Sequence, residues 1–206
     1  MDARVILETI AVVGAAYFIG AIPFGYVIVR IAKGVDIRKY GSGSTGTTNV
    51  LRTAGKLAAA LTVAGDFLKG VFVVVAARLL KLPDISIVLA GFAVVGGHNW
   101  PVFLKFKGGR GVATGFGVSL GLTWQISTAL FIFWGILIAA TGYVSLASVI
   151  IMIMYPLMVI YFHEPWPVIL FAIVGAGMVI FTHRKNVVRL FKGEETKIGH
   201  KVKLDK

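Results

Sequence analysis

Seven apolar segments fill most of this 206-residue chain and leave little room for anything except membrane-spanning helices. A bilayer core of about 30 Å requires roughly 20 apolar residues per helix, so the chain can hold at most about seven spans with short connections. Hydrophobic residues make up 57% of the sequence and the mean hydropathy is +0.87, more than a soluble domain of this size can bury. The apolar segments are 5–29, 57–80, 85–97, 112–122, 125–141, 143–162 and 166–182.

The distribution of positive charge predicts the topology. Three basic stretches, 30–56, 105–110 and the residues from 184 onward, contrast with four nearly neutral connections. Lys and Arg accumulate in cytoplasmic loops, so an even number of spans must separate each pair of basic stretches. We therefore expect an all-α integral membrane protein with about seven transmembrane helices, an extracytoplasmic N-terminus and a cytoplasmic C-terminus; a count of six breaks the parity. The short segments 85–97 and 112–122 fit either short helices or re-entrant segments.

The chain shows no repeat of fixed period and no low-complexity linker, so we expect a single domain over residues 1–206. The first apolar segment lacks a preceding basic region and a small-residue cleavage site, and we interpret it as a retained helix. Trp100, Trp124 and Trp166 fall at the predicted span edges, where interfacial aromatic residues gather.

Charge and cysteine content limit the chemistry. The net charge of +12 suits nucleic acid, anionic lipid or an anionic substrate, although the cytoplasmic bias of Lys and Arg accounts for part of it. A chain without cysteine has neither a disulfide nor a thiol nucleophile, and its four histidines are too dispersed for a local metal motif. We therefore expect no metal and no cofactor.

The first basic stretch carries a glycine-rich and hydroxyl-rich segment, Gly41 to Arg52. Glycine permits close approach of backbone N–H groups to an anion, and the hydroxyls and Arg52 add hydrogen bonds. A flexible loop is the alternative. The segment formally matches a dinucleotide fingerprint, but no strand precedes it, and the P-loop pattern fails because Leu57 follows Gly55-Lys56. The candidate ligands are Ser42, Gly43, Thr47, Thr48, Asn49 and Arg52.

The second basic stretch places a glycine cluster directly before an apolar helix. Helix N-termini attract anions through free N–H groups and the macrodipole. An ordinary juxtamembrane basic turn is the competing interpretation. The candidate residues are Lys105, Lys107, Gly108, Gly109 and Arg110, with His98 upstream.

The third basic stretch begins at His183, where the last span leaves the membrane. On a continuing helix His183, Asn186 and Arg189 or Leu190 share one face.

Within the second span, Asp66 and Lys69 lie three residues apart, and an ionisable pair at that depth is costly enough to be a functional candidate. We favour an ion pair that braces the helices.

These three motifs closely resemble those of the PlsY family, the bacterial acyl-phosphate:glycerol-3-phosphate acyltransferases. The resemblance rests on Gly-Ser-Gly at 41–43 with Thr48, Asn49 and Arg52; on Gly97-His98 with 106–114; and on His183 with Asn186, Arg189 and Glu195. It also includes Pro23-Phe24-Gly25 and 66–70. Ser44, Arg110 and Thr182 depart from the family's usual residues, Thr182 by removing a cation.

The resemblance implies transfer of a fatty acyl group from acyl phosphate to the 1-hydroxyl of glycerol 3-phosphate, the first step of phospholipid synthesis, at the cytoplasmic face of the bacterial inner membrane. The partners expected are the two substrates and membrane lipid, without nucleic acid or an obligate protein partner. Either His183 or the donor phosphate is the general base. The expected catalytic residues are Ser42, Arg52, Lys107, His183 and Asn186; the expected substrate ligands are Gly43, Thr47, Thr48, Asn49, Lys105, Gly108, Gly109 and Arg110; the expected structural residues are His98, Asp66, Lys69 and Glu195.

Two other classes remain open from the residues themselves. An anion transporter also gathers basic, glycine-rich loops on a helical bundle, but it places its site near the midplane and commonly shows internal repeats. A structural subunit of a larger complex leaves three donor-rich motifs without a role.

Overall fold

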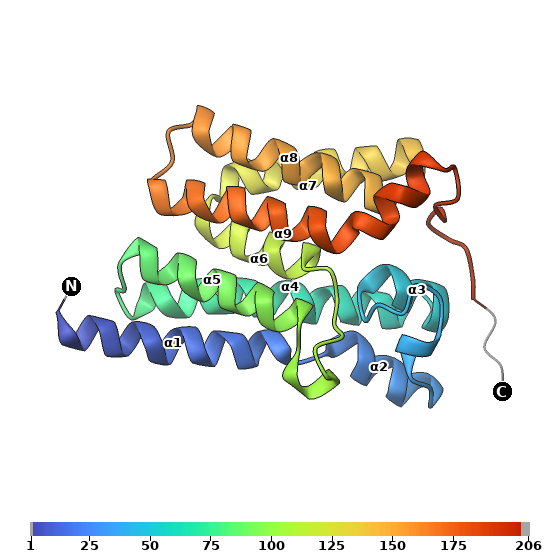
Figure 1. The fold of residues 1–206 in the computed structure, drawn as a ribbon, viewed down its shortest axis with the longest axis horizontal. Helices are drawn as coiled ribbons and strands as arrows, with labels where there is room; N and C mark the ends of the chain where they lie inside the picture. Colours follow the sequence, from blue (N-terminus) through green and yellow to red (C-terminus); the bar gives the residue numbers. More distant parts are fainter. Residues whose placement is uncertain (1, 203–206) are drawn as a thin grey trace.

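The computed structural model describes residues 2–202 as a bundle of α-helices (Figure 1). The helices are α1 (Ala3–Ala21), α2 (Phe24–Lys33), α3 (Thr47–Ala54), α4 (Lys56–Leu79), α5 (Asp84–Asn99), α6 (Val112–Leu122), α7 (Trp124–Thr141), α8 (Val144–Tyr161) and α9 (Trp166–Phe191), with 3₁₀ turns η1 (Ile37–Lys39) and η2 (Val102–Leu104).

Six helical segments are long and apolar enough to cross a membrane. The predicted fourth span, α6, has only 11 residues, which corresponds to about 16 Å and is too short to cross a core of about 30 Å alone. The expected count of seven membrane-spanning helices is therefore not confirmed. α6 nevertheless ends beside the last turn of α4, where Arg78 donates to the Leu122 carbonyl at 3.4 Å.

The first predicted span is broken at Pro23. Proline cannot donate the backbone hydrogen bond that an unbroken helix needs, so α1 ends at Ala21 and α2 begins at Phe24. The last predicted span, in contrast, continues without interruption through His183 to Phe191, as the third motif required. The break leaves carbonyl groups near residue 22 that need other donors.

The helices approach one another through small residues. A Cβ added at Gly97 of α5 would meet the Tyr17 carbonyl and the Ala21 amide of α1. A Cβ at Gly117 of α6 would meet the Phe67 carbonyl of α4. Close backbone contact of this kind replaces the hydrophobic effect, which does not drive helix association in lipid.

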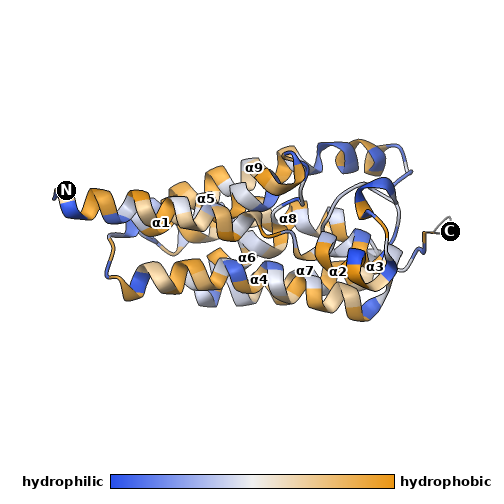
Figure 2. Ribbon diagram, turned by 90° about the horizontal axis from the view of Figure 1, so that it is seen from below, coloured by the Kyte–Doolittle hydropathy of each residue, from blue (hydrophilic) through white to orange (hydrophobic). Residues whose placement is uncertain are grey.

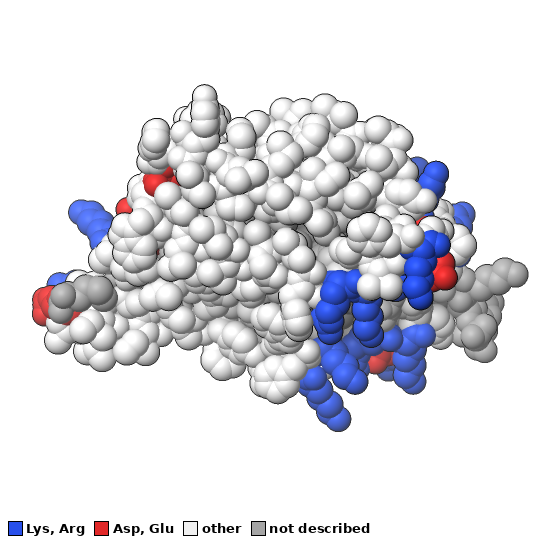
Figure 3. All heavy atoms as spheres, turned by 45° about the horizontal axis from the view of Figure 1, so that its top comes forward, with Lys and Arg blue, Asp and Glu red and all other residues white. Residues whose placement is uncertain are grey.

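The surface divides into an apolar body and one basic end. Hydrophobic residues cover the middle of the helices in Figure 2, while hydrophilic residues gather around α3 and the end of α9. Most Lys and Arg side chains visible in Figure 3 lie at that same end. The start of α1 and the segment after α9 lie at opposite ends of the long axis (Figure 1). Trp100, Trp124 and Trp166 lie at helix ends, as the sequence predicts.

Candidate active site

A cavity of about 850 Å³ brings the three sequence motifs together at the basic end of the bundle. Its polar region lies between α3, the residues before α6, the end of α9 and the segment that follows α9. Its apolar region continues between α4, α6, α7 and α8. The convergence of three motifs that are far apart in the sequence is the arrangement expected of a substrate site.

Most of the candidate residues line this cavity, but five of the predicted catalytic or substrate-binding residues do not. Lys105 and Lys107 are exposed, and the glycines 108 and 109 use their amides within the chain, donating to the carbonyls of Asn99 at 3.2 Å and His98 at 3.1 Å. The predicted residues in the wall are Ser42, Thr47, Thr48, Asn49, Arg52, Asp66, His98, Arg110, His183, Asn186 and Glu195; those outside it are Gly43, Lys69, Lys105, Lys107, Gly108 and Gly109.

The first motif is only partly a loop. Thr47 begins α3, so the residues from Thr47 to Arg52 lie on a short helix that the sequence analysis did not predict. Asn49 fixes the preceding turn, because its Nδ2 donates to the Tyr40 and Ser44 carbonyls at 3.0 and 2.9 Å. Its Oδ1 accepts from the Ser42 amide at 3.1 Å. Asn49 therefore shapes the loop and has little capacity left for a ligand.

The second motif is tied to both of the others. Arg38 Nη1 donates to the Leu104 carbonyl at 3.2 Å, which connects η1 to the loop. Thr182 of α9 donates through its hydroxyl to the Arg110 carbonyl at 3.0 Å. Through these bonds Arg110 is held at the cavity wall.

The third motif is organised by Glu195. Its carboxylate accepts from Asn186 Nδ2 at 2.6 Å, Ser145 Oγ at 3.0 Å and Arg189 Nε at 2.8 Å. Burial opposes ionisation of this carboxyl, but the hydrogen bonds from Arg189, Asn186 and Ser145 outweigh it and hold its pKa below the ordinary value. Glu195 thereby joins α8, α9 and the segment after α9.

His183 is oriented by its own helix. Its Nδ1 lies 2.9 Å from the Val179 carbonyl. A carbonyl can only accept, so Nδ1 carries the proton and Nε2 keeps its lone pair. Asn186 does not orient the ring, because its Nδ2 is engaged by Glu195 and its Oδ1 is buried without a partner in the described chain.

The guanidinium groups of the cavity wall are only partly neutralised. Arg52 and Arg110 both lie near Arg189, and among residues 2–202 the carboxylate that offsets them is Glu195, since Asp66, the other acidic residue of the wall, is paired with Lys69. Burial, with repulsion from Arg189 and Arg52 and only partial relief from Glu195, lowers the pKa of Arg110 to about 10. Burial also lowers the pKa of Arg52, whose Nη2 donates to the Thr196 carbonyl at 2.7 Å. An anionic ligand would relieve this unfavourable electrostatic state.

A second polar cluster reaches the cavity wall from inside the bundle. Lys69 Nζ lies 2.8 Å from Asp66 Oδ1 and 3.0 Å from His98 Nδ1. It also donates to the Gly20 and Ile22 carbonyls at 2.9 and 3.2 Å, at the break between α1 and α2. The pair anticipated from the sequence is therefore a buried three-residue cluster that includes His98.

The apolar region of the cavity is walled by aromatic rings. Phe67, Phe116, Phe131 and Trp134 form a continuous series, with neighbouring ring centroids 6.0, 4.9 and 5.7 Å apart. Phe131 of α7 is 51% exposed, so the wall opens toward the lipid side of the bundle. From Ile138 to Thr128 the lining of α7 covers eleven residues, a rise of about 15 Å. That is half of a core of about 30 Å, the depth available to one acyl chain in one leaflet.

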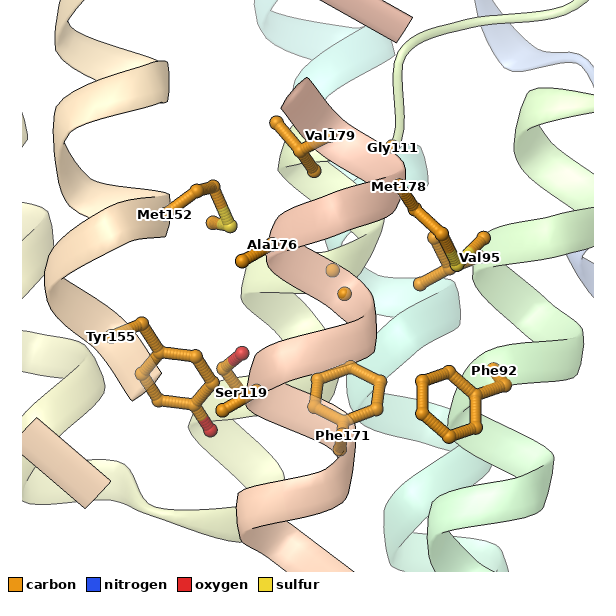
Figure 4. A pocket seen from close by; sticks show the side chains of 13 residues that line it. Phe92, Val95, Gly111, Ser119, Met152, Tyr155, Phe171, Ala176, Met178 and Val179 are labelled. Carbon is orange, nitrogen blue, oxygen red and sulfur yellow. The ribbon is translucent and has the colours of Figure 1, made fainter. Parts of the chain in front are cut away.

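A second, much smaller cavity lies between α5, α6, α8 and α9 (Figure 4). Its volume is about 20 Å³, enough for about one water molecule. Phe92 and Phe171 face it from one side and the Ser119 and Tyr155 hydroxyls from another (Figure 4). It is too small for a substrate.

Several residues of the site were not predicted from the sequence. Ser145 binds Glu195, Thr182 binds the Arg110 carbonyl, and the aromatic series walls the apolar region. Phe67 and Phe116 each lie beside a predicted polar motif, which was the available signal. Ser145 had no local signal, because its partner is 50 positions away.

Comparison with known proteins agrees with this geometry. A sequence model of the glycerol-3-phosphate acyltransferase family matches residues 10–193. The glycerol-3-phosphate acyltransferase of Rubrobacter xylanophilus is 43% identical over 183 residues, covering 89% of this chain and 92% of that protein. Glycerol-3-phosphate acyltransferase 2 of Moorella thermoacetica is 42% identical, covering 90% and 95%.

Solved structures give the same result. Crystal structures of PlsY (YgiH), an integral membrane glycerol 3-phosphate acyltransferase, superpose with TM-scores of 0.88 for the glycerol 3-phosphate form and 0.86 for the lysophosphatidic acid form. Sequence identity is 38% and 37%, and coverage is 93% and 94% of this chain and 96% of each crystallised chain. This chain belongs to the glycerol-3-phosphate acyltransferase family, the integral membrane acyltransferases of phospholipid synthesis.

Proposed function

We propose that this chain transfers a fatty acyl group from acyl phosphate to the 1-hydroxyl of glycerol 3-phosphate, producing lysophosphatidic acid and inorganic phosphate. The observation that carries the proposal is the division of the cavity, whose basic polar region is continuous with an aromatic-walled region as deep as a single leaflet. A substrate with a phosphate at one end and an alkyl chain at the other matches both regions. The comparison proteins support the glycerol 3-phosphate acceptor by their descriptions.

The reaction needs no covalent enzyme intermediate. The hydroxyl oxygen of the acceptor attacks the acyl carbonyl carbon, the bond from that carbon to the phosphate oxygen breaks, and inorganic phosphate leaves with the bonding electrons. The hydroxyl proton passes to His183 Nε2 or to an oxygen of the donor phosphate. A mixed anhydride has a good leaving group, and a chain without cysteine lacks the most nucleophilic side chain.

The places of the polar residues in the wall support a proposed role for each. Arg110 and the hydroxyls of Ser42, Thr47 and Thr48 are positioned to hold phosphate, and Arg52 is a second guanidinium for the other substrate. Ser42 acts as a phosphate ligand in this scheme; a trapped acyl-enzyme at Ser42 would show that it is a nucleophile.

The alkyl chain lies along the aromatic series and enters from the lipid through the opening at Phe131. Both phosphates stay at the basic end, which faces the cytoplasm of the bacterial inner membrane in this proposal.

The decisive assay supplies purified protein in lipid with palmitoyl phosphate and glycerol 3-phosphate, and measures phosphate release and lysophosphatidate formation. A parallel reaction contains palmitoyl-CoA. We expect turnover with acyl phosphate alone. Turnover with the CoA thioester would reassign the donor, and no turnover with either donor by folded protein would contradict the proposal.

A further inference from the structure

His98 has one ring nitrogen fixed by a buried ion pair and the other without a partner in the described chain. Lys69 Nζ lies 3.0 Å from His98 Nδ1, and a protonated lysine can only donate. Its three shortest polar contacts are Asp66 Oδ1 at 2.8 Å, the Gly20 carbonyl at 2.9 Å and His98 Nδ1. The Ile22 carbonyl at 3.2 Å is a fourth acceptor, so the two carbonyls share one N–H group. An ammonium has no lone pair to accept a ring proton, so at 3.0 Å Nδ1 accepts from Lys69 and the proton of the neutral imidazole is on Nε2.

The cluster is rigid because it is buried and anchored on three helices. Asp66, Lys69 and His98 are 2%, 5% and 7% exposed. Removing an ion pair from water is costly, and the charges of Asp66 and Lys69 compensate one another with a hydrogen-bonded neutral ring beside them. The carbonyl acceptors come from the break at Pro23, so the sequence feature that interrupts the first span also fixes the lysine.

The edge of the ring that carries Nε2 lies against the second motif. The atoms nearest to a Cβ built on Gly109 are His98 Nε2 and its two neighbouring ring carbons. The Gly109 amide donates to the carbonyl of His98 itself at 3.1 Å. No hydrogen-bond partner for Nε2 occurs among residues 2–202. His98 nevertheless lies in the cavity wall, and Gly109, the residue against its ring, directly precedes Arg110 in the sequence.

We propose that His98 is a substrate-binding residue whose Nε2–H donates a hydrogen bond to a phosphate oxygen of a substrate in the cavity. It adds a donor to the anion site without adding a charge to a region where Arg52, Arg110 and Arg189 already share one carboxylate. The Asp66–Lys69 pair is a positioning pair that holds the ring in the tautomer required. The inference rests on the proposed function for the nature of the ligand.

Two substitutions distinguish a role of His98 in binding phosphate from a role in supporting Lys69. Each of them replaces only one of the two ring nitrogens with an equivalent polar atom. His98→Asn retains an oxygen acceptor near the Nδ1 position for Lys69 and loses the donor at Nε2. His98→Gln extends an amide donor to about the Nε2 position and loses the contact with Lys69. The exposed His163, in the turn after α8, supplies the matched control His163→Asn.

We expect His98→Asn to raise the KM of one phosphate substrate about 10-fold or more, with thermal stability close to that of the wild type. His98→Gln should raise the KM less and lower stability more. Varying glycerol 3-phosphate at saturating palmitoyl phosphate, and then the reverse, identifies which phosphate is bound. A purely supporting role predicts the opposite: near-normal kinetics for His98→Asn and a defect confined to His98→Gln.

Two further measurements test the role of His98 without relying on the enzymatic assay. Calorimetric titration of the wild type and His98→Asn with glycerol 3-phosphate and with inorganic phosphate tests binding even if the assay of the proposed reaction fails. ¹⁵N spectra of the His98 ring report the tautomer, and a proton on Nδ1 would overturn the proposal. Gly109→Ala, which pushes against the Nε2 edge, should reproduce the KM effect of His98→Asn.

Discussion

His183 is the residue whose replacement separates the two routes for the proton. Its Nδ1 is bonded to the Val179 carbonyl, so Nε2 is the nitrogen left to accept a proton. If Nε2 is the general base, His183→Gln lowers kcat by roughly 10²- to 10⁴-fold with a much smaller change in KM. Steady-state kinetics with both substrates measures the change, and near-normal kcat would assign the proton to the donor phosphate.

Substitutions of Arg110 and Lys107 test whether the motif or the cavity lining better predicts which residue binds phosphate. The motif alone assigned catalysis to Lys107, whereas Arg110 lines the cavity and Lys107 is exposed outside it. We expect Arg110→Ala to raise the KM of a phosphate substrate about 10-fold or more, since it removes a charge-assisted hydrogen bond. Lys107→Ala should change the KM less than about 2-fold, a loss of roughly 0.4 kcal/mol or less. The reverse ranking would restore the assignment made from the motif.

Glu195 gives stability a defined dependence on pH. Its folded-state pKa is depressed by the bonds from Arg189, Asn186 and Ser145, although burial acts against this. A depressed carboxyl pKa stabilises the fold above the unfolded-state value and loses that contribution as pH falls through the folded-state value. The apparent Tm of the wild type should therefore exceed that of Glu195→Gln at neutral pH, and the difference should shrink as pH falls below the ordinary carboxyl value of 4.5. A difference independent of pH would exclude the ionised carboxylate as its source.

At the scale of elements, α4 and α6 pack backbone against backbone. Gly117 leaves no room for a Cβ beside the Phe67 carbonyl, whereas Gly135 of α7 has nothing within 4 Å of the same position. Gly117→Ala forces the two helices apart, and overpacking of this kind costs roughly 1–3 kcal/mol. We expect its apparent Tm in detergent to fall by roughly 2 to 12 °C, while Gly135→Ala leaves it unchanged or slightly higher. Equal effects of the two substitutions would contradict this packing.

The elements show where prediction from the sequence succeeds. Lipid permits only helices with internally satisfied backbone groups, so long apolar segments identify the spans with boundaries close to those of α4, α7 and α8 and to the start of α9, which continues nine residues beyond the predicted end at 182. α3 was not predicted because a segment of eight mostly polar residues is too short for its few apolar residues to establish a helical period. The break at Pro23 had a visible cause, but its consequence required Lys69 from another helix.

The site was predictable at the level of motifs and less so at the level of contacts. The motifs predict which segments bind anions, and these segments converge on one cavity. They do not reveal which side chains enter the cavity, because Lys107 and Arg110 are chemically similar and three positions apart. Likewise, the environment of His98 depends on a contact with a residue 29 positions earlier. Tertiary packing determines which side chains enter the cavity and which residues contact them, and the local sequence contains little information on that packing.

On the scale of the whole molecule, most of the charged residues gather at one end of the long axis and apolar residues fill most of the rest. The basic end holds the polar region of the cavity, and the apolar region extends from it for about half of a bilayer core. A site at this depth lets a phosphate stay hydrated and paired with guanidinium groups while the alkyl chain remains in lipid. The charge asymmetry that predicts orientation in the membrane therefore also supplies the electrostatics of the site.

Orientation and the number of passes are measurable together, because a chain without cysteine accepts single reporter cysteines cleanly. Asp84, Gln125 and Lys192 are exposed and lie at the start of α5, the start of α7 and just beyond α9. Since α6 ends beside the last turn of α4, we expect Asp84→Cys and Gln125→Cys to react with an impermeant maleimide in right-side-out vesicles. Lys192→Cys should react only after lysis, because segments rich in Lys and Arg are generally retained in the cytoplasm. Reaction of Asp84→Cys and Lys192→Cys in intact vesicles, with Gln125→Cys reacting only after lysis, would mean that the chain does not cross the membrane at α6. Reaction of Lys192→Cys alone in intact vesicles would reverse the orientation.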